Sequence, residues 1–473
     1  MSAAQLPSRL RVARPVAAVG LALLLGACAT GPAFEVPAED FKGRVSLVDT
    51  PVVLPGSEVK VAGQNFVPGQ QVQLSYGGAR LGSAVTVDAE GKFRTAFNVP
   101  ADAPAGQHPV VVNASKPLAA LVQPLKVSPH VPLSGQDRFS TASQKLVPGL
   151  YQAAYSARSD RVFVTSAAGR PPVTQSELVK VHPQTLAIEA RVAPRPAPAR
   201  APAPGQQARD PGVFAVYGVG VDDSQGTVWV TNTRQDTVAV YRQSDLALLK
   251  QFEPGAVPHA RDVLVDEARG KAFVSPVFHP AIKVFDTRTL QALPEIKIET
   301  TVKGRDAKDF SPMSIDLDRA AGKLYVVSGT APEVAIIDTA SGKVDKVFLV
   351  EGVRSAAGIG YDERSKRLFV TGQGSDNVVI VDPATGKTLH DVPVGAGPLN
   401  VAVDAPRGLA YIPNRAAGTV TVVNTDGRIV ANLPGGTFPN HLTFDGKGSV
   451  FAVNKARGAE DPQGDRITRI TPR

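Results

Sequence analysis

The sequence predicts an all-β protein in which a small N-terminal β-sandwich precedes a seven-bladed β-propeller. Three observations lead to this fold class. The 473 residues include 43 glycines and 40 prolines, which would break helices repeatedly. Short alternating apolar segments separated by turn residues fill residues 44–128. From residue 162 onward, a strand-like segment with a central aromatic residue recurs along the chain.

The first residues have the pattern of a secretory signal rather than of a domain. Arg9, Arg11 and Arg14 precede an apolar run that is too short to span a bilayer. The sequence Leu-Gly-Ala-Cys at 25–28 ends this run, and Cys28 is the single cysteine of the chain. One cysteine excludes an intrachain disulfide framework and a cysteine-based zinc cluster.

Residues 25–28 resemble the lipobox of bacterial lipoproteins. The resemblance implies that residues 1–28 are a lipoprotein signal peptide, that Cys28 is the lipidation site, and that the N-terminal lipid holds the protein in a membrane. Ala29, directly after the cysteine, implies an outer-membrane lipoprotein that faces the periplasm. The alternative is ordinary cleavage after Ala-Cys-Ala at 27–29, which would give a soluble periplasmic protein.

A linker and a small β domain are predicted next. Residues 29–43 contain proline and acidic residues without periodicity, as linkers do. Regular turn signals between short apolar segments over 44–128 predict a β-sandwich. The stretch Gly-Ser-Glu-Val-Lys-Val-Ala-Gly-Gln-Asn-Phe-Val-Pro-Gly at 56–69 resembles bacterial immunoglobulin-like (Ig-like) surface domains. Such a domain is a spacer or a binding module, and we expect a spacer because nothing in it looks like a site.

The region 138–473 is built from repeats with constant internal spacing. The central aromatic residues are Phe163, Trp229, Phe273, Tyr325, Phe369, Tyr411 and Phe451. Five aspartates lie seven residues before an aromatic, namely Asp222, Asp266, Asp318, Asp362 and Asp404. We expect the aspartates to cap a turn between the first and second strands of each repeat. Four-stranded repeats of about 40 to 45 residues are typical of a β-propeller, so seven copies predict seven blades.

The last repeat also predicts how the ring closes. It ends at Arg473 with a third strand at 467–470 and has no fourth strand of its own. A segment around residues 143–147, before the first repeat, could supply that strand. We expect this pairing because it would remove two exposed sheet edges.

Several repeats resemble a known family. Val-Trp-Val-Thr-Asn (228–232), Leu-Tyr-Val (324–326) and Phe-Val-Thr (369–371) are similar to the YVTN repeat, as are the stretches 381–387 and 394–402. In order and detail, the copies resemble the YncE-like bacterial periplasmic seven-bladed propellers. The resemblance implies the fold of the repeat region. It says little about function, because propellers host many unrelated activities.

The predicted topology places the long loops on one face, where binding usually occurs on a rigid scaffold. The largest insertion is a proline-rich loop at 193–212, which is either an exposed partner ligand or a passive segment. The first strand of each repeat starts on the same face, so partly polar residues should surround one mouth of the central channel. This candidate ligand-binding mouth consists of Gln152, Arg261, Asp262, Ser314, Asn400, Asn440 and His441. A water-filled channel mouth without a ligand is the alternative.

The sequence contains no nucleophile-elbow, Walker or metalloprotease motif, and its seven histidines lack metal-ligand spacing. We therefore predict no catalytic residue, no metal site and no cofactor. The expected protein is a monomeric, non-catalytic binding scaffold of the cell envelope, whose partner is an unidentified protein or envelope polymer. A propeller enzyme of lactonase or lyase type is the first alternative.

Weak binding to nucleic acid or to another anionic polymer is the second alternative. The formal net charge of +8 favours such a partner. Three of the positive charges are arginines within residues 1–28, however, so the mature chain is only mildly basic. A low charge spread over a long chain is a weak footprint for phosphate binding.

Overall fold

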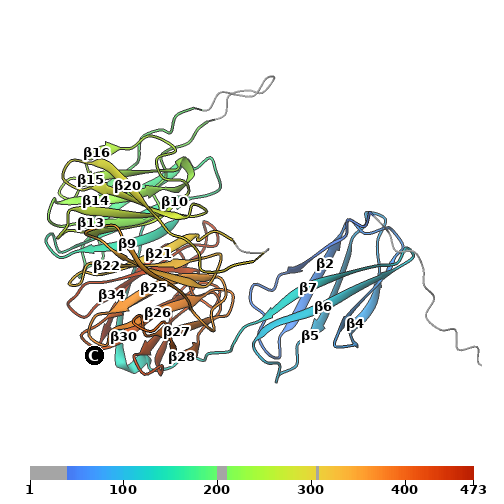
Figure 1. Cartoon of the computed structure of the whole chain (residues 1–473). Helices are drawn as coiled ribbons and strands as arrows, with labels where there is room; N and C mark the ends of the chain where they lie inside the picture. Colours follow the sequence, from blue (N-terminus) through green and yellow to red (C-terminus); the bar gives the residue numbers. More distant parts are fainter. Residues whose placement is uncertain (1–39, 200–209, 305–307) are drawn as a thin grey trace, which may run out of the picture.

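The computed structural model describes residues 40–199, 210–304 and 308–473, and within these ranges the protein is almost entirely β (Figure 1). Two short 3₁₀ helices interrupt the strands, η1 (Gln136–Arg138) and η2 (Thr233–Gln235). The predicted signal peptide with Cys28, most of the predicted linker 29–43 and the centre of the proline-rich loop 193–212 lie outside the described residues.

The first seven strands form two antiparallel sheets, which we call the sandwich. They are β1 (Arg44–Val48), β2 (Glu58–Gln64), β3 (Gln71–Tyr76), β4 (Ala79–Thr86), β5 (Phe93–Asn98), β6 (Gly106–Ser115) and β7 (Ala119–Val127). The strand orders are β1-β2-β5 and β4-β3-β6-β7. One core joins the two sheets, with Val59 and Val61 from one sheet and Val72 and Leu74 from the other. Their alternation with exposed residues is the pattern of a strand with one buried face.

The remaining strands form seven four-stranded antiparallel sheets within the described residues. The first strands of the sheets are β9 (Leu150–Ser156), β13 (Val219–Asp222), β17 (Ala260–Asp266), β21 (Pro312–Asp318), β25 (Ala356–Asp362), β29 (Ala402–Asp404) and β33 (Pro439–Phe444). The second strands are β10 (Arg161–Ala168), β14 (Thr227–Asn232), β18 (Lys271–Pro276), β22 (Lys323–Ser328), β26 (Arg367–Gly372), β30 (Leu409–Asn414) and β34 (Val450–Asn454).

The two outer strands complete each sheet. The third strands are β11 (Gln175–Val181), β15 (Thr237–Arg242), β19 (Ala281–Asp286), β23 (Glu333–Asp338), β27 (Asn377–Val381), β31 (Thr419–Asn424) and β35 (Arg466–Pro472). The fourth strands are β12 (Ile188–Val192), β16 (Leu248–Gln251), β20 (Gln291–Lys297), β24 (Val344–Leu349), β28 (Thr388–Pro393), β32 (Ile429–Pro434) and, in the last sheet, β8 (Phe139–Lys145).

The first strands lie innermost and contact one another in a closed circle, from β9 through β13, β17, β21, β25, β29 and β33 back to β9. We call this assembly of residues 139–472 the ring. The repeating aromatic residues all lie on the second strand of their sheet and are buried, as the sequence predicts. Both faces of each second strand are buried because neighbouring sheets stack on them, which explains their continuous apolar runs.

The ring closes as predicted, because a strand from before the first repeat replaces the fourth strand that the last repeat lacks. Strand β8 pairs antiparallel with β35 along its whole length, from Arg466 opposite Lys145 to Pro472 opposite Phe139. The pairing confirms that a segment before the first repeat completes the last sheet, although it covers 139–145 rather than 143–147. Residues more than three hundred positions apart therefore hold one sheet together, and the edge of β35 is covered.

Four of the five repeating aspartates cap turns as expected, whereas the carboxylate of Asp266 accepts from the side chains of Arg269 (3.0 Å) and Thr339 (2.7 Å) instead. Asp222, Asp318, Asp362 and Asp404 each accept hydrogen bonds from backbone N–H groups two or three residues later. All four residues are nearly inaccessible to solvent, and each lies at the turn between the first and second strands of its sheet. The turns therefore fix the end of the ring opposite the face where the first strands begin.

Candidate functional site

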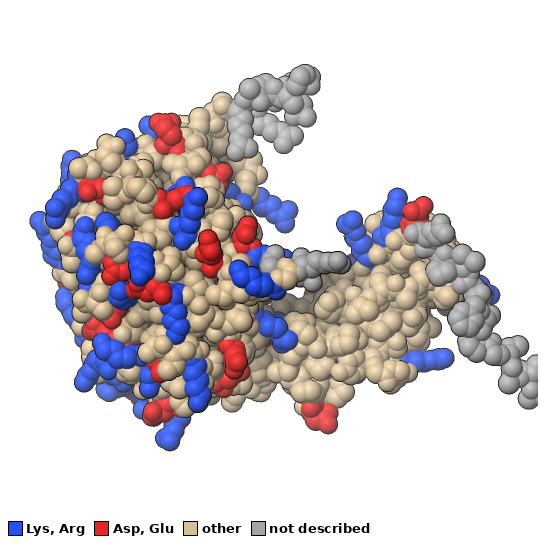
Figure 2. Space-filling view, in the orientation of Figure 1, with Lys and Arg blue, Asp and Glu red and all other residues tan. Residues whose placement is uncertain are grey.

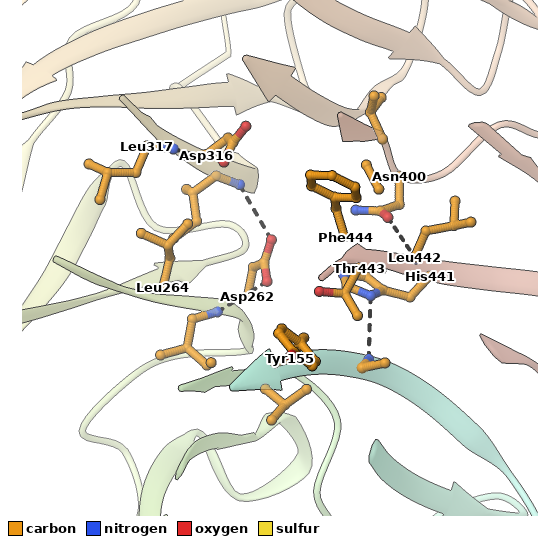
Figure 3. Close-up of a pocket in the computed structure, with 18 of the residues that line it drawn as sticks. Tyr155, Asp262, Leu264, Asp316, Leu317, Asn400, His441, Leu442, Thr443 and Phe444 are labelled. Carbon is orange, nitrogen blue, oxygen red and sulfur yellow. Dashed lines mark hydrogen bonds between the residues drawn. The ribbon is translucent and has the colours of Figure 1, made fainter. Parts of the chain in front are cut away.

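A cavity of about 340 Å³ lies at the centre of the ring, and all seven innermost strands contribute to its wall. Three members of the predicted mouth line it, namely Asp262, Asn400 and His441. Figure 3 shows Asp262 and Asp316 on one side of this cavity and Asn400 and His441 on the other. The cavity is therefore polar at this level, while residues such as Leu264, Leu317 and Phe444 make other parts of the wall apolar.

Side chains at equivalent repeat positions join four pairs of neighbouring inner strands by a hydrogen bond. Each accepts from a backbone N–H on the neighbouring strand: Gln152 Oε1 from Val219 (3.1 Å), Asp262 Oδ2 from Ile315 (3.4 Å), Asn400 Oδ1 from Leu442 (2.9 Å) and His441 Nδ1 from Ala153 (3.4 Å). The donor always lies one residue after the equivalent position of the next repeat. These polar residues thus satisfy backbone groups that burial would otherwise leave unpaired.

The cavity shifts the pKa of its titratable groups in opposite directions. Burial, reinforced by the charge of Arg261, lowers the pKa of His441 to about 3, so its imidazole is neutral with the proton on Nε2. Burial raises the pKa of Asp262 to about 6, and Arg261 partly opposes this rise. Burial also raises the pKa of Asp316, which the repeat pattern does not single out. Its carboxylate accepts bonds from the N–H groups of Tyr361 (2.7 Å) and Leu317 (2.8 Å).

The other members of the predicted mouth are distributed at different depths. Gln152 and Ser314 are buried within their strands. Asn440 lies at the start of β33, where its amide donates to the carbonyl of Tyr151 (2.6 Å) and its carbonyl accepts from Arg415. Arg261 lies at the loop-rich opening of the ring. Of the seven predicted residues, three therefore line the central cavity and Arg261 lines this opening, whereas Gln152, Ser314 and Asn440 line neither hollow.

A second hollow of about 360 Å³, which we call the mouth recess, opens at the loop-rich end of the inner strands. Its wall includes Tyr151, His259, Arg261, Phe278 and Met313. Phe278 belongs to the loop between β18 and β19 and is 78% exposed, the most exposed large apolar side chain among the described residues. The repeat pattern gives no signal for it, because loops between strands do not follow the repeat.

Cationic side chains and aromatic rings gather next to this recess. The Tyr151 and Tyr217 rings meet edge to face at 5.0 Å between centroids, and Lys455 Nζ lies 5.6 Å from the Tyr151 centroid. Burial raises the pKa of Tyr217, and the nearby Arg234 opposes this rise. Arg415 is held by Asn440 and lies 5.0 Å from the ring of Phe438. Together with Arg261 in the wall of the recess, these residues bring positive charge from four sheets to one opening.

Three bulky residues near the recess have left-handed backbone conformations. The φ angles are 44° at His259, 69° at Phe278 and 46° at Phe438. His259 and Phe438 directly precede β17 and β33, and the ring of His259 lies 5.5 Å from that of Phe278. Such conformations cost about 1 to 2 kcal/mol for a residue with a Cβ atom, and they concentrate at functional sites.

Charge on the visible outer surface is mixed. Figure 2 shows lysine and arginine interspersed with aspartate and glutamate over the ring, whereas the visible face of the sandwich is largely uncharged. Within the described residues, no group of three or more histidine, cysteine, aspartate or glutamate side chains is arranged to hold a metal ion. No helix in the same ranges is long and apolar enough to cross a membrane.

The comparisons with known proteins agree with this architecture. The uncharacterized protein YncE of Salmonella typhi is 27% identical to this chain over 273 residues, which cover 54% of this chain and 74% of that protein. This chain is a β-propeller protein similar to YncE. YncE of Salmonella typhimurium gives the same match, and no family model matches the sequence.

Solved structures support the propeller fold at low sequence identity. The WD40 repeats of RRP9 superimpose with a TM-score of 0.54 at 9% identity, covering 73% of this chain and all of that chain. A streptogramin B lyase superimposes with a TM-score of 0.53 at 13% identity, covering 72% of this chain and all of that one. At these identities the YncE-like propeller shares a fold with these proteins, and the likeness carries no function.

Proposed function

We propose that this protein is a non-catalytic binding scaffold of the cell envelope, whose ligand binds the loop-rich face of the propeller. The mouth recess carries the proposal, because it holds about 360 Å³ and combines aromatic, apolar and cationic side chains. Hollows of this size with apolar walls and a few polar groups are typical ligand sites. The exposed ring of Phe278 supports the proposal, since a ligand that covered it would remove apolar surface from water.

The central cavity is a weaker candidate for the same role. Its polar side chains already accept hydrogen bonds from neighbouring inner strands, which ties them to the stability of the ring. Arg261 in the mouth recess differs, because its buried Nε has no hydrogen-bond partner among the described residues. An unsatisfied buried donor is costly unless a ligand or water pairs with it, and this favours the recess.

We further propose that the ring is a seven-bladed propeller, with one blade for each of its four-stranded sheets, and that the sandwich is an Ig-like spacer. The closed circle of inner strands supports the blade count. The shared core of two antiparallel sheets supports the sandwich assignment. The protein would be monomeric, and a lipid on Cys28 would hold it in the outer membrane facing the periplasm. The lipobox-like residues 25–28 support that location.

Site-specific crosslinking tests the choice of face. A photoreactive phenylalanine analogue replaces Phe278 in the recess or, as the control, Asp426 in the turn between β31 and β32 at the opposite end. We expect irradiation of cells to give a discrete adduct through position 278 and none through position 426. Equal adducts at both positions, or no adduct at 278, would contradict binding through the loop-rich face.

A further inference from the structure

We propose that the mouth recess binds a small polyvalent oxyanion, meaning a molecule with two or more carboxylate or phosphate groups. This inference rests on the proposed use of the loop-rich face for binding and adds the chemical class of the ligand. It comes from the charged groups around the recess, which are described next.

Four cationic side chains surround the opening, and each comes from a different sheet. Arg261 lines the recess itself, and Arg234 follows Thr233, which also lines it. Lys455 lies over the ring of Tyr151, another wall residue, and Arg415 reaches Tyr151 through Asn440. Burial lowers the pKa of Lys455, repulsion from Arg415 and Arg234 lowers it further, and attraction to Asp465 partly opposes this fall. The cations therefore lie close enough to destabilise one another, and an anion between them would relieve that repulsion.

These four cations form no salt bridge in the part of the chain that the structure describes. Three carboxylates are near, and each accepts a hydrogen bond from a backbone N–H group. Asp236 accepts from His259 (2.7 Å), Asp465 from Gly149 (2.8 Å), and Asp262 from Val263 (3.1 Å). Burial raises the pKa of Asp262 and so reduces its negative charge. Asp236 and Asp465 offset part of the positive charge, but the four cations outnumber these carboxylates. Because the cations surround the opening, a ligand with two or more anionic groups can approach more than one of them.

The recess also limits the size and shape of the ligand. A volume of about 360 Å³ suits a small molecule. The Ser311 hydroxyl accepts from the N–H of Phe278 (3.1 Å) and can donate its own proton to an oxyanion oxygen, whereas the Thr233 hydroxyl already donates to the carbonyl of Ala260 (2.6 Å). Met313 and Phe278 offer an apolar surface to a carbon skeleton. The guanidinium group of arginine can donate two parallel hydrogen bonds to a carboxylate or to a phosphate. The recess therefore defines the ligand as an oxyanion, which can be either a polycarboxylate or a phosphate compound.

Calorimetric titration of the full chain tests the inference, with citrate as the polycarboxylate probe, pyrophosphate as the phosphate probe and trehalose as a neutral control. We expect one anion or both to bind at low ionic strength and to bind more weakly as salt is added. The double variant Arg234→Gln with Arg261→Gln should weaken binding about tenfold or more, a loss of roughly 1.4 kcal/mol. The matched control is Arg242→Gln with Arg428→Gln, two exposed arginines at the opposite end of the ring, and it should leave affinity unchanged.

The outcomes separate the possibilities. Binding of citrate alone or pyrophosphate alone assigns the source, and binding of both assigns the shared class. Failure of both anions to bind, or equal weakening in the two double variants, overturns the inference. Thermal unfolding checks that the variants are folded, and Lys455→Gln removes one of the four charges independently if the double variant is unstable. A crosslink through position 278 without anion binding would leave the proposed function standing while this inference fails.

Discussion

The imidazole of His441 occupies a position that requires a neutral side chain. It is half-buried at the wall of the central cavity, its Nδ1 accepts a hydrogen bond from the N–H of Ala153, and Arg261 adds positive potential. The equivalent residue of the preceding repeat is Asn400, whose Oδ1 makes the same kind of bond to Leu442. The repeat spacing places both residues on the inner strand, but it cannot show that they bridge neighbouring sheets, because that contact depends on the closed ring.

Replacing His441 with asparagine should remove a pH dependence of stability. The folded pKa of about 3 lies below the ordinary value, so the stability from a neutral His441 is present above about pH 6.5 and is lost as the pH falls towards 3. Between pH 7.5 and 5, the wild type should lose about 2 kcal/mol of unfolding free energy relative to His441→Asn.

Urea unfolding at several pH values measures this difference. The exposed His390→Asn variant is the control and should follow the wild type. Parallel loss of stability in the wild type and His441→Asn would show that the folded protein protonates His441 freely. Asp262 acts in the opposite sense, because its raised pKa makes stability fall as the pH rises from about 4 to 6, so each side chain has to be tested separately.

At the scale of single elements, the inner strands approach one another closely where the repeat carries glycine. Gly218 in the segment leading into β13 and Gly358 in β25 occupy the position that Gln152 and Asn400 fill in other repeats. A Cβ atom on Gly218 would lie 2.3 Å from the carbonyl oxygen of Arg261, and one on Gly358 would lie 2.6 Å from Cα of Asn400. In each of these two repeats, the inner strand therefore packs its backbone against the backbone of the next inner strand. This contact takes the place of a bridging side chain.

Gly218→Ala should destabilise the protein, because backbone atoms of the neighbouring strand cannot move aside as a flexible side chain would. We expect a loss of about 1 to 3 kcal/mol, measured by urea unfolding. Gly458→Ala is the matched control, since no heavy atom lies within 4 Å of its added Cβ. A change at Gly218 no larger than that at Gly458 would show that β13 and β17 separate easily.

At the scale of the whole molecule, the sandwich and the ring are joined by more than the chain. Lys126 on β7 forms a salt bridge with the nearly buried Asp376 (2.8 Å) and donates to the carbonyl of Gln373 (3.0 Å), a residue of the mouth recess. Figure 1 shows the sandwich beside the ring, connected through the segment before β8. The sequence predicts both domains from their separate patterns, whereas the contact between them pairs residues 250 positions apart.

At the same scale, a single substitution tests the proposed membrane attachment. In Cys28→Ser, we expect an alkyne-tagged fatty acid no longer to label the protein, and the protein to leave the outer-membrane fraction, because a serine cannot take a thioether-linked lipid. Labelling gels and membrane fractionation measure both effects. An unlabelled wild type would contradict lipidation and would favour cleavage to a soluble form.

The sequence by itself determined the parts of this protein that repeat. Alternating apolar residues, turn aspartates and buried aromatic residues recur at nearly constant spacing, and this local pattern predicts the strands and their order. The closing strand β8 follows from the need to cover exposed sheet edges. It also identified Arg261, Asp262, Asn400, Asn440 and His441 as residues near the axis. The tertiary structure decided that Asp262, Asn400 and His441 line the cavity and that Arg261 lines the mouth recess.

Only the tertiary structure could bring together Arg234, Arg261, Arg415 and Lys455, or expose Phe278 at their edge. These residues belong to loops and strand ends of different sheets, where no periodicity constrains the residue type. Their proximity arises because the ring closes and folds four distant segments onto one opening. Local pattern encodes the blades, whereas the charge and shape of the mouth are collective properties of the closed ring.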